Sequence, residues 1–151
     1  MLQTWLLLSL AALLIWGSWG LFANLTTQYL GGFSALVWEV IGAMVVGAII
    51  LGWLFRSEGL ETSMRGATFG LLTGISYTVG LTFLFLALAS ANNAETAGNS
   101  SQVHSIIVLT ALYPVLAVGL NYVFLSEPVS LRQLVGMGIG LMGIAILMTG
   151  R

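Results

Sequence analysis

The sequence has no cysteine, no aspartate and no lysine, and its one histidine is His104. Without cysteine, the chain cannot form a disulfide, use a thiolate nucleophile or bind a metal through sulfur. A single histidine and the lack of aspartate argue against a Ser-His-Asp triad and against a metal centre with several histidine ligands. A nucleophile, a base and an orienting group do not occur together at any helical spacing. We therefore expect no enzymatic activity, no metal and no cofactor.

Charged residues are also scarce, at 6% of the 151 residues, whereas a soluble domain usually carries about 25%. Hydrophobic residues make up 58% of the chain, and the mean hydropathy is +1.03. Such a surface is favourable only where it faces lipid. The net charge of −1 gives no reason to expect a nucleic-acid partner. The sequence therefore predicts an integral membrane protein whose surroundings are the lipid bilayer.

Five apolar stretches are long enough to be membrane-spanning helices, since about 20 residues cross roughly 30 Å of hydrocarbon. They cover residues 3–23, 33–54, 66–89, 103–125 and 131–149. The first lacks a preceding basic region, so we interpret it as a retained span and not as a signal peptide. Residues 90–102 are small and polar and are predicted to link two spans, and Ser130 and Gln133 fit a capping box before the last span. The expected fold is all-α, a single five-helix transmembrane domain over residues 1–151.

The arginines predict the orientation of this multi-pass protein. With five spans, Arg56, Arg65 and Arg132 lie on the same side as the N-terminus, and Arg151 lies on the other side. Because basic loops stay in the cytoplasm, we expect a cytoplasmic N-terminus in the cell (inner) membrane. The excess is small, so it is also compatible with insertion in both orientations.

Glycines recur every four residues on two of the predicted helices. Gly66, Gly70 and Gly74 share one face of the third span, and Gly136 and Gly140 share one face of the fifth. Small residues at this spacing let membrane helices approach closely. The alternative is chance, because the chain is rich in glycine. We predict that these faces take part in helix packing or assembly.

Glu39 is the one acidic residue inside a predicted span. An ionised carboxylate in hydrocarbon is costly, so Glu39 must face a cavity, find a partner or be protonated. A carboxylate in that position can exchange a proton for a substrate. The alternative is a neutral structural carboxyl group that bonds to a neighbouring helix. His104, at the start of the fourth span on the same predicted side, either pairs with Glu39 or is simply exposed.

Several aromatic and polar side chains lie away from the interfacial belts that usually hold tryptophan and tyrosine. Trp16 and Trp19 on the first span and Tyr77 on the third are candidates for lining a substrate path, and Asn121 is a weaker candidate.

Pro114 lies within the fourth span, directly after Tyr113. Its ring removes one backbone hydrogen bond and displaces the carbonyl of Thr110, which predicts a kink. The kink is either a matter of packing alone or a hinge beside a polar cavity that Tyr113 would help to line.

Two stretches of the sequence are similar to a known family. The first is Trp16-Gly17-Ser18-Trp19-Gly20. The second covers the last two spans and includes Ala111-Leu112-Tyr113-Pro114-Val115-Leu116, Phe124-Leu125-Ser126-Glu127-Pro128-Val129-Ser130 and Gln133-Leu134-Val135-Gly136. Together they resemble the EamA-type repeat of the drug/metabolite transporter superfamily, and the resemblance covers essentially the whole chain.

The resemblance implies a secondary transporter, often an exporter, of a small metabolite or drug-like molecule. Most members of the family look like two five-helix repeats in inverted orientation, whereas this chain matches one repeat. One repeat supplies half of the usual central cavity, so the resemblance implies a dimer, most simply with an antiparallel second copy. Together with Glu39, it leads us to expect a dimer that works by alternating access, with proton coupling through Glu39 as a hypothesis. The alternative function is a non-transporting scaffold or accessory subunit of a larger complex.

Overall fold

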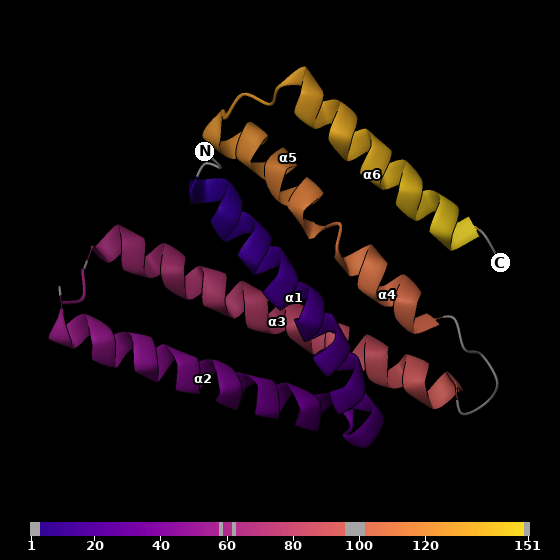
Figure 1. The fold of residues 1–151 in the computed structure, drawn as a ribbon, viewed down its shortest axis with the longest axis horizontal. Coiled ribbons are helices and arrows are strands. Elements are labelled where there is room, and N and C mark those ends of the chain that lie inside the picture. Colours follow the sequence, from indigo (N-terminus) through magenta and orange to yellow (C-terminus); the bar gives the residue numbers. More distant parts are fainter. Residues whose placement is uncertain (1–3, 58, 62, 96–101, 150–151) are drawn as a thin grey trace. The chain divides into compact units, whose positions relative to one another are not determined.

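The computed structural model describes residues 4–57, 59–61, 63–95 and 102–149. Within these ranges all regular secondary structure is helical (Figure 1): α1 is Thr4–Tyr29, α2 is Gly32–Arg56, α3 is Met64–Glu95, α4 is Gln102–Thr110, α5 is Tyr113–Leu125 and α6 is Leu131–Thr149. The predicted all-α fold is therefore confirmed. The chain divides into two compact units, Met1–Ala94 with α1 to α3 and Glu95–Arg151 with α4 to α6.

Four stretches are long and apolar enough to cross a membrane. They are α1, α2, the part of α3 up to Asn93, and Gln102–Leu125, which contains both α4 and α5. The apolar part of α6, Leu131–Ile146, is shorter. The whole of α6 has 19 residues and a length of about 28 Å, close to the hydrocarbon thickness. These segments form an all-α membrane bundle.

Two helices extend beyond the predicted bounds. Helix α1 continues to Tyr29, about a turn and a half past residue 23, and α3 continues to Glu95, past residue 89. Both extensions contain polar residues, whose side chains find hydrogen-bond partners on the helix backbone or on a neighbouring helix. The hydroxyl of Thr26 donates to the carbonyl of Phe22 at 2.8 Å. Part of the predicted 90–102 link is thus helical, and residues 96–101 lie outside the described residues.

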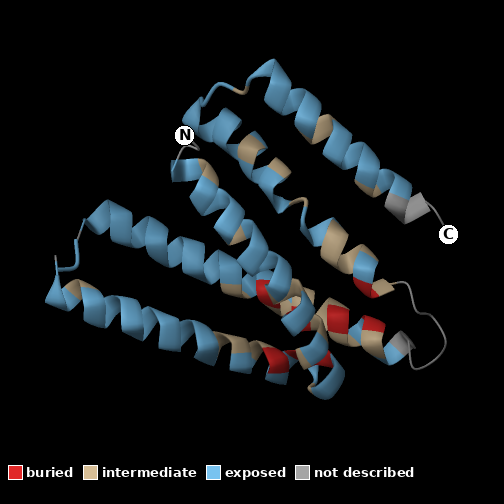
Figure 2. Cartoon of the chain, viewed as in Figure 1, coloured by how far each residue is buried: buried red, intermediate tan, exposed pale blue. Residues whose placement is uncertain are grey.

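The buried side chains of the first unit gather where its three helices meet (Figure 2). Helix α3 contributes Leu81, Phe85 and Leu88, of which Phe85 and Leu88 are almost completely buried. Ala23 of α1 and Ala35 of α2 are also buried, and both line the same pocket as Phe85. Most other large apolar side chains of the unit are exposed, as a lipid-facing surface requires. The core of this unit is therefore small and confined to one end of α1 and α2.

The approach of α2 to α3 is close because α2 begins with glycine. A Cβ atom at Gly32 would lie 3.0 Å from the carbonyl oxygen of Phe85 and 3.2 Å from the Cα of Leu86. Any larger residue would push the two helices apart, since the opposing atoms belong to the backbone. Gly32 thus sets the distance between α2 and α3 two turns before Glu39.

In the second unit, the fourth predicted span is divided in two. Helix α4 ends at Thr110, α5 begins at Tyr113, and Pro114 lies in the first turn of α5. Proline has no N–H group, so it cannot donate to the carbonyl of Thr110. The Thr110 hydroxyl donates to the backbone carbonyl of Ile106, one turn earlier in α4, at 2.9 Å.

Helix α6 begins with the predicted capping box, which the structure confirms. The backbone N–H of Ser130 donates to Oε1 of Gln133 at 2.8 Å, and the N–H of Gln133 donates to the Ser130 hydroxyl at 3.3 Å. Helices α4 and α6 also contact each other within this unit.

The glycines predicted to pack helices together face open space among the described residues. A Cβ atom at Gly70, Gly74, Gly136 or Gly140 would meet nothing within 4 Å, and one at Gly66 would meet the side chain of Ser63 alone, just before α3. The role of these glycines in packing stays a prediction about assembly.

Candidate functional site

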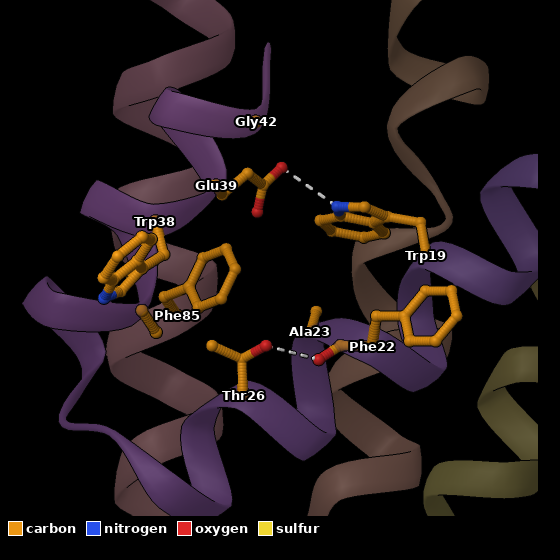
Figure 3. Close-up of a pocket in the computed structure, with 9 residues that line it drawn as sticks. Trp19, Phe22, Ala23, Thr26, Trp38, Glu39, Gly42 and Phe85 are labelled. Carbon is orange, nitrogen blue, oxygen red and sulfur yellow. Dashed lines mark hydrogen bonds between the residues drawn. The ribbon is translucent and has the colours of Figure 1, made fainter. Parts of the chain in front are cut away.

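Glu39 of α2 lies between the other two helices of the first unit (Figure 3). The indole N–H of Trp19, on α1, donates to its Oε1 at 2.9 Å. The hydroxyl of Tyr77, on α3, donates to the same oxygen at 3.3 Å. Glu39 is partly buried and stands seven residues after the first residue of α2, or about 10 Å along the helix. One carboxylate therefore connects three membrane helices.

No positive charge accompanies this carboxylate among the described residues. Its hydrogen-bond donors, Trp19 and Tyr77, are both neutral. Helix α1 carries no charged residue, and the charged residues of α3, Arg65 and Glu95, lie at its two ends. Arg65 is 12 residues from Tyr77, which corresponds to about 18 Å along the helix. The described residues of α1 to α3 thus leave the negative charge of an ionised Glu39 uncompensated.

A pocket of about 300 Å³ opens beside Glu39. It is lined by Trp19, Phe22, Ala23 and Thr26 of α1, by Ala35, Trp38, Glu39 and Gly42 of α2, and by Phe85 of α3. Figure 3 shows the indole of Trp38 and the ring of Phe85 on one side of the view and Trp19 on the other. The volume is at the lower end of the range for small-molecule sites, and a mainly apolar lining with few polar groups is typical of them.

The spacing of residues along α2 explains why a pocket forms at this point. Ala35, Glu39 and Gly42 recur at intervals of four and three residues and so share one face of the helix. Small residues one turn before and one turn after the carboxylate leave room beside it. A Cβ atom at Gly42 would meet no other atom within 4 Å. Large aromatic rings from each of the three helices then border this space.

A second polar contact joins α1 to α3 farther along the unit. The side-chain amide of Asn92 donates to the hydroxyl of Thr27 at 3.0 Å and to Oδ1 of Asn24 at 3.3 Å. Thr27 is buried, and its own hydroxyl donates to the carbonyl of Asn24 at 2.9 Å. These bonds tie α1 to α3 near the end of α1 and so help to set the register of the helices that carry Trp19 and Tyr77.

The other predicted site residues lie elsewhere. Trp16 is 63% exposed and is not among the residues that line this pocket. His104, Tyr113 and Asn121 belong to the second unit and are exposed. The backbone carbonyl of Asn121 accepts the N–H that caps α5. A pairing of His104 with Glu39 stays a prediction, because the two residues belong to different units.

Trp38, Phe85 and Asn92 were not predicted as part of a site. Trp38 directly precedes Glu39, and its position in an apolar run is no different from that of a lipid-facing residue. Phe85 and Asn92 do carry a signal. Leu81, Phe85, Leu88 and Asn92 recur at intervals of four, three and four, which places an asparagine on the buried stripe of α3.

Comparison with known proteins gives one result. A sequence profile of the EamA-like transporter family matches residues 3–149, which is nearly the entire chain. Searches of curated proteins and of solved structures each found no match. The chain belongs to the EamA-like transporter family.

Proposed function

We propose that this member of the EamA-like transporter family is a proton-coupled secondary transporter of a small metabolite or drug-like molecule, which works as a dimer by alternating access. The observation that carries the proposal is Glu39, a membrane-embedded carboxylate with two neutral hydrogen-bond donors beside a pocket of about 300 Å³. Acidic residues within membrane spans commonly mark ion and substrate pathways.

Glu39 is suited to exchange a proton for a substrate. Without a basic partner among the described residues, its ionised form is unfavourable in the membrane unless a ligand or water compensates the charge. The protonated form needs no such compensation. Binding of substrate and binding of a proton therefore compete at one group, and this competition couples the two movements.

Transport is tested in proteoliposomes that contain the pH-sensitive dye pyranine. Solutes from a panel of small amines, amino acids and sugars are added outside, and coupled flux appears as a change in internal pH. We expect at least one solute to produce a change with the wild-type protein and none with Glu39→Gln. Glu61→Gln, in the loop after α2, removes an exposed acid outside the spans and should retain the signal. Equal signals from Glu39→Gln and wild type would exclude Glu39 from the coupling.

The glycine faces of α3 and α6 support the dimer. A Cβ atom at Gly140 of α6 would meet no other described residue within 4 Å, and the pocket beside Glu39 is open. A second copy would bury such a face by close helix packing. An antiparallel copy would in addition reproduce the inverted arrangement of two-repeat transporters.

The lack of cysteine makes this proposal easy to test by crosslinking. A single cysteine introduced as Gly140→Cys should form a self-crosslinked dimer in native membranes. Met142→Cys is the control, because it lies on the same helix but about 200° away from Gly140. Crosslinks to a different protein alone, with no second copy, would favour an accessory subunit over a transporter dimer.

A further inference from the structure

We infer that the pocket beside Glu39 binds an organic cation with an aromatic or apolar group, such as a quaternary ammonium compound. This inference rests on the proposed function and names the substrate class of the same site. It follows from three properties of the pocket: its one carboxylate, the absence of a compensating base among the described residues, and its aromatic walls.

The charge of the pocket selects a cation. Its lining contains one ionisable side chain, Glu39, and its remaining side chains are neutral. Both neutral donors, Trp19 and Tyr77, bond to the same oxygen, Oε1. The other oxygen, Oε2, accepts no hydrogen bond from any described residue and is left for a ligand. An anion placed here would be repelled, and a neutral sugar would find few polar partners.

The walls of the pocket select a cation that is weakly hydrated. Trp19, Trp38 and Phe85 border the pocket, each from a different helix. Aromatic faces attract cations, tryptophan most strongly, and aromatic cages of this kind bind quaternary ammonium groups. Metal ions are not favoured, since no cluster of three acidic or histidine side chains occurs among the described residues.

A proton and such a cation would compete for Glu39. The groups that face Glu39 from the neighbouring helices are the indole of Trp19 on α1 and the phenol of Tyr77 on α3. Neither of these groups gains a proton at acidic pH, and Arg65 and Glu95 are at the far ends of α3. A fall in binding at acidic pH would therefore report the protonation of Glu39.

Benzyltrimethylammonium is a suitable probe, because it joins an aromatic ring to a cation that has no proton to lose. Its binding is measured by equilibrium dialysis against the full chain in phosphatidylcholine nanodiscs, with empty nanodiscs as background. We expect saturable binding that excess benzenesulfonate or benzyl alcohol does not displace, and that weakens as the pH is lowered. Benzenesulfonate tests the charge, and benzyl alcohol tests the aromatic ring alone.

Three variants locate the binding. Glu39→Gln should weaken binding by at least about tenfold and abolish its pH dependence, whereas Glu61→Gln should leave both unchanged. Trp38→Leu should weaken binding by several-fold, whereas Trp53→Leu, on the same helix but outside the pocket lining, should not. Gly42→Leu places a large side chain in the pocket, where a Cβ atom would meet no other described residue within 4 Å. This variant should block binding although Glu39 is retained.

Two outcomes overturn the inference: no saturable binding of benzyltrimethylammonium, or binding that Glu39→Gln leaves intact. Either result would still leave the transporter proposal standing if another solute drives a Glu39-dependent pH change in the vesicles. Conversely, Glu39-dependent binding of the cation without flux of any solute would support the site and overturn transport. A size-exclusion profile equal to that of the wild type is required of each variant, so that loss of folding is not mistaken for loss of binding.

Discussion

Replacement of Gly32 by alanine tests how α2 and α3 are held together. The new Cβ atom would lie 3.0 Å from the Phe85 carbonyl oxygen, whereas ordinary contacts begin at 3.4 Å. The two helices must therefore separate locally by about 0.4 Å, since helix backbone cannot rotate away as a side chain can. Overpacking of this kind typically costs about 1–3 kcal/mol. Glu39 lies two turns farther along α2, so the 3.3 Å contact with Tyr77 should lengthen as well.

Gly47→Ala is the matched control for this substitution. Gly47 also lies on α2, and a Cβ atom there would meet nothing within 4 Å. Gly47→Ala gains the helix propensity of alanine, about 1 kcal/mol in a helix interior, whereas Gly32 is the first residue of α2 and gains less. The difference between the variants therefore contains the cost of packing and this smaller gain, and both lower the midpoint of Gly32→Ala relative to Gly47→Ala. We expect a thermal midpoint in detergent that is about 2–12 °C lower for Gly32→Ala than for Gly47→Ala. Equal midpoints would refute the close approach of α2 to α3.

Three further changes test the polar contacts. Trp19→Phe combined with Glu39→Leu in a double-mutant cycle should show a coupling of about 0.6 kcal/mol or more in unfolding free energy, and additive effects would contradict the hydrogen bond. Asn92→Leu should destabilise the protein by about 1–2 kcal/mol in thermal unfolding, because buried Thr27 loses its partner on α3. Gln133→Ala should weaken the start of α6 by about 1 kcal/mol, seen as faster hydrogen exchange in its first turn; unchanged exchange would contradict the capping box.

The fold could be predicted from the sequence because its main determinant is one-dimensional. A run of about 20 apolar residues must form a helix in lipid, since every backbone N–H and C=O needs a partner within its own segment. The ends of the helices were less predictable. Polar residues such as Thr26 can stop a helix or bond to the preceding turn, and Thr26 does the latter. Asn92 likewise remains helical because α1 supplies partners for its amide.

The candidate site was predictable in part, for a related reason. An acid within an apolar span attracts notice by itself, so Glu39 could be picked out from the sequence. Its partners depend on how the helices are rotated about their axes. The sequence gives no reason to choose between Trp16 and Trp19, because both lie in the same apolar helix. In the structure, Trp19 donates to the carboxylate, and Trp16 is largely exposed.

The glycines show how the same pattern serves two purposes. Gly32 lies where α2 packs closely against the backbone of α3, whereas Gly42, ten residues later on α2, borders the pocket beside Glu39. The regular series at Gly70 and Gly74 is more conspicuous, but a Cβ atom at either position would meet no other described residue within 4 Å. Small residues allow two helix backbones to approach closely, and the contact of α2 with α3 explains the glycine at position 32. The face with Gly70 and Gly74 is therefore the one on which the proposed second copy of the chain would pack.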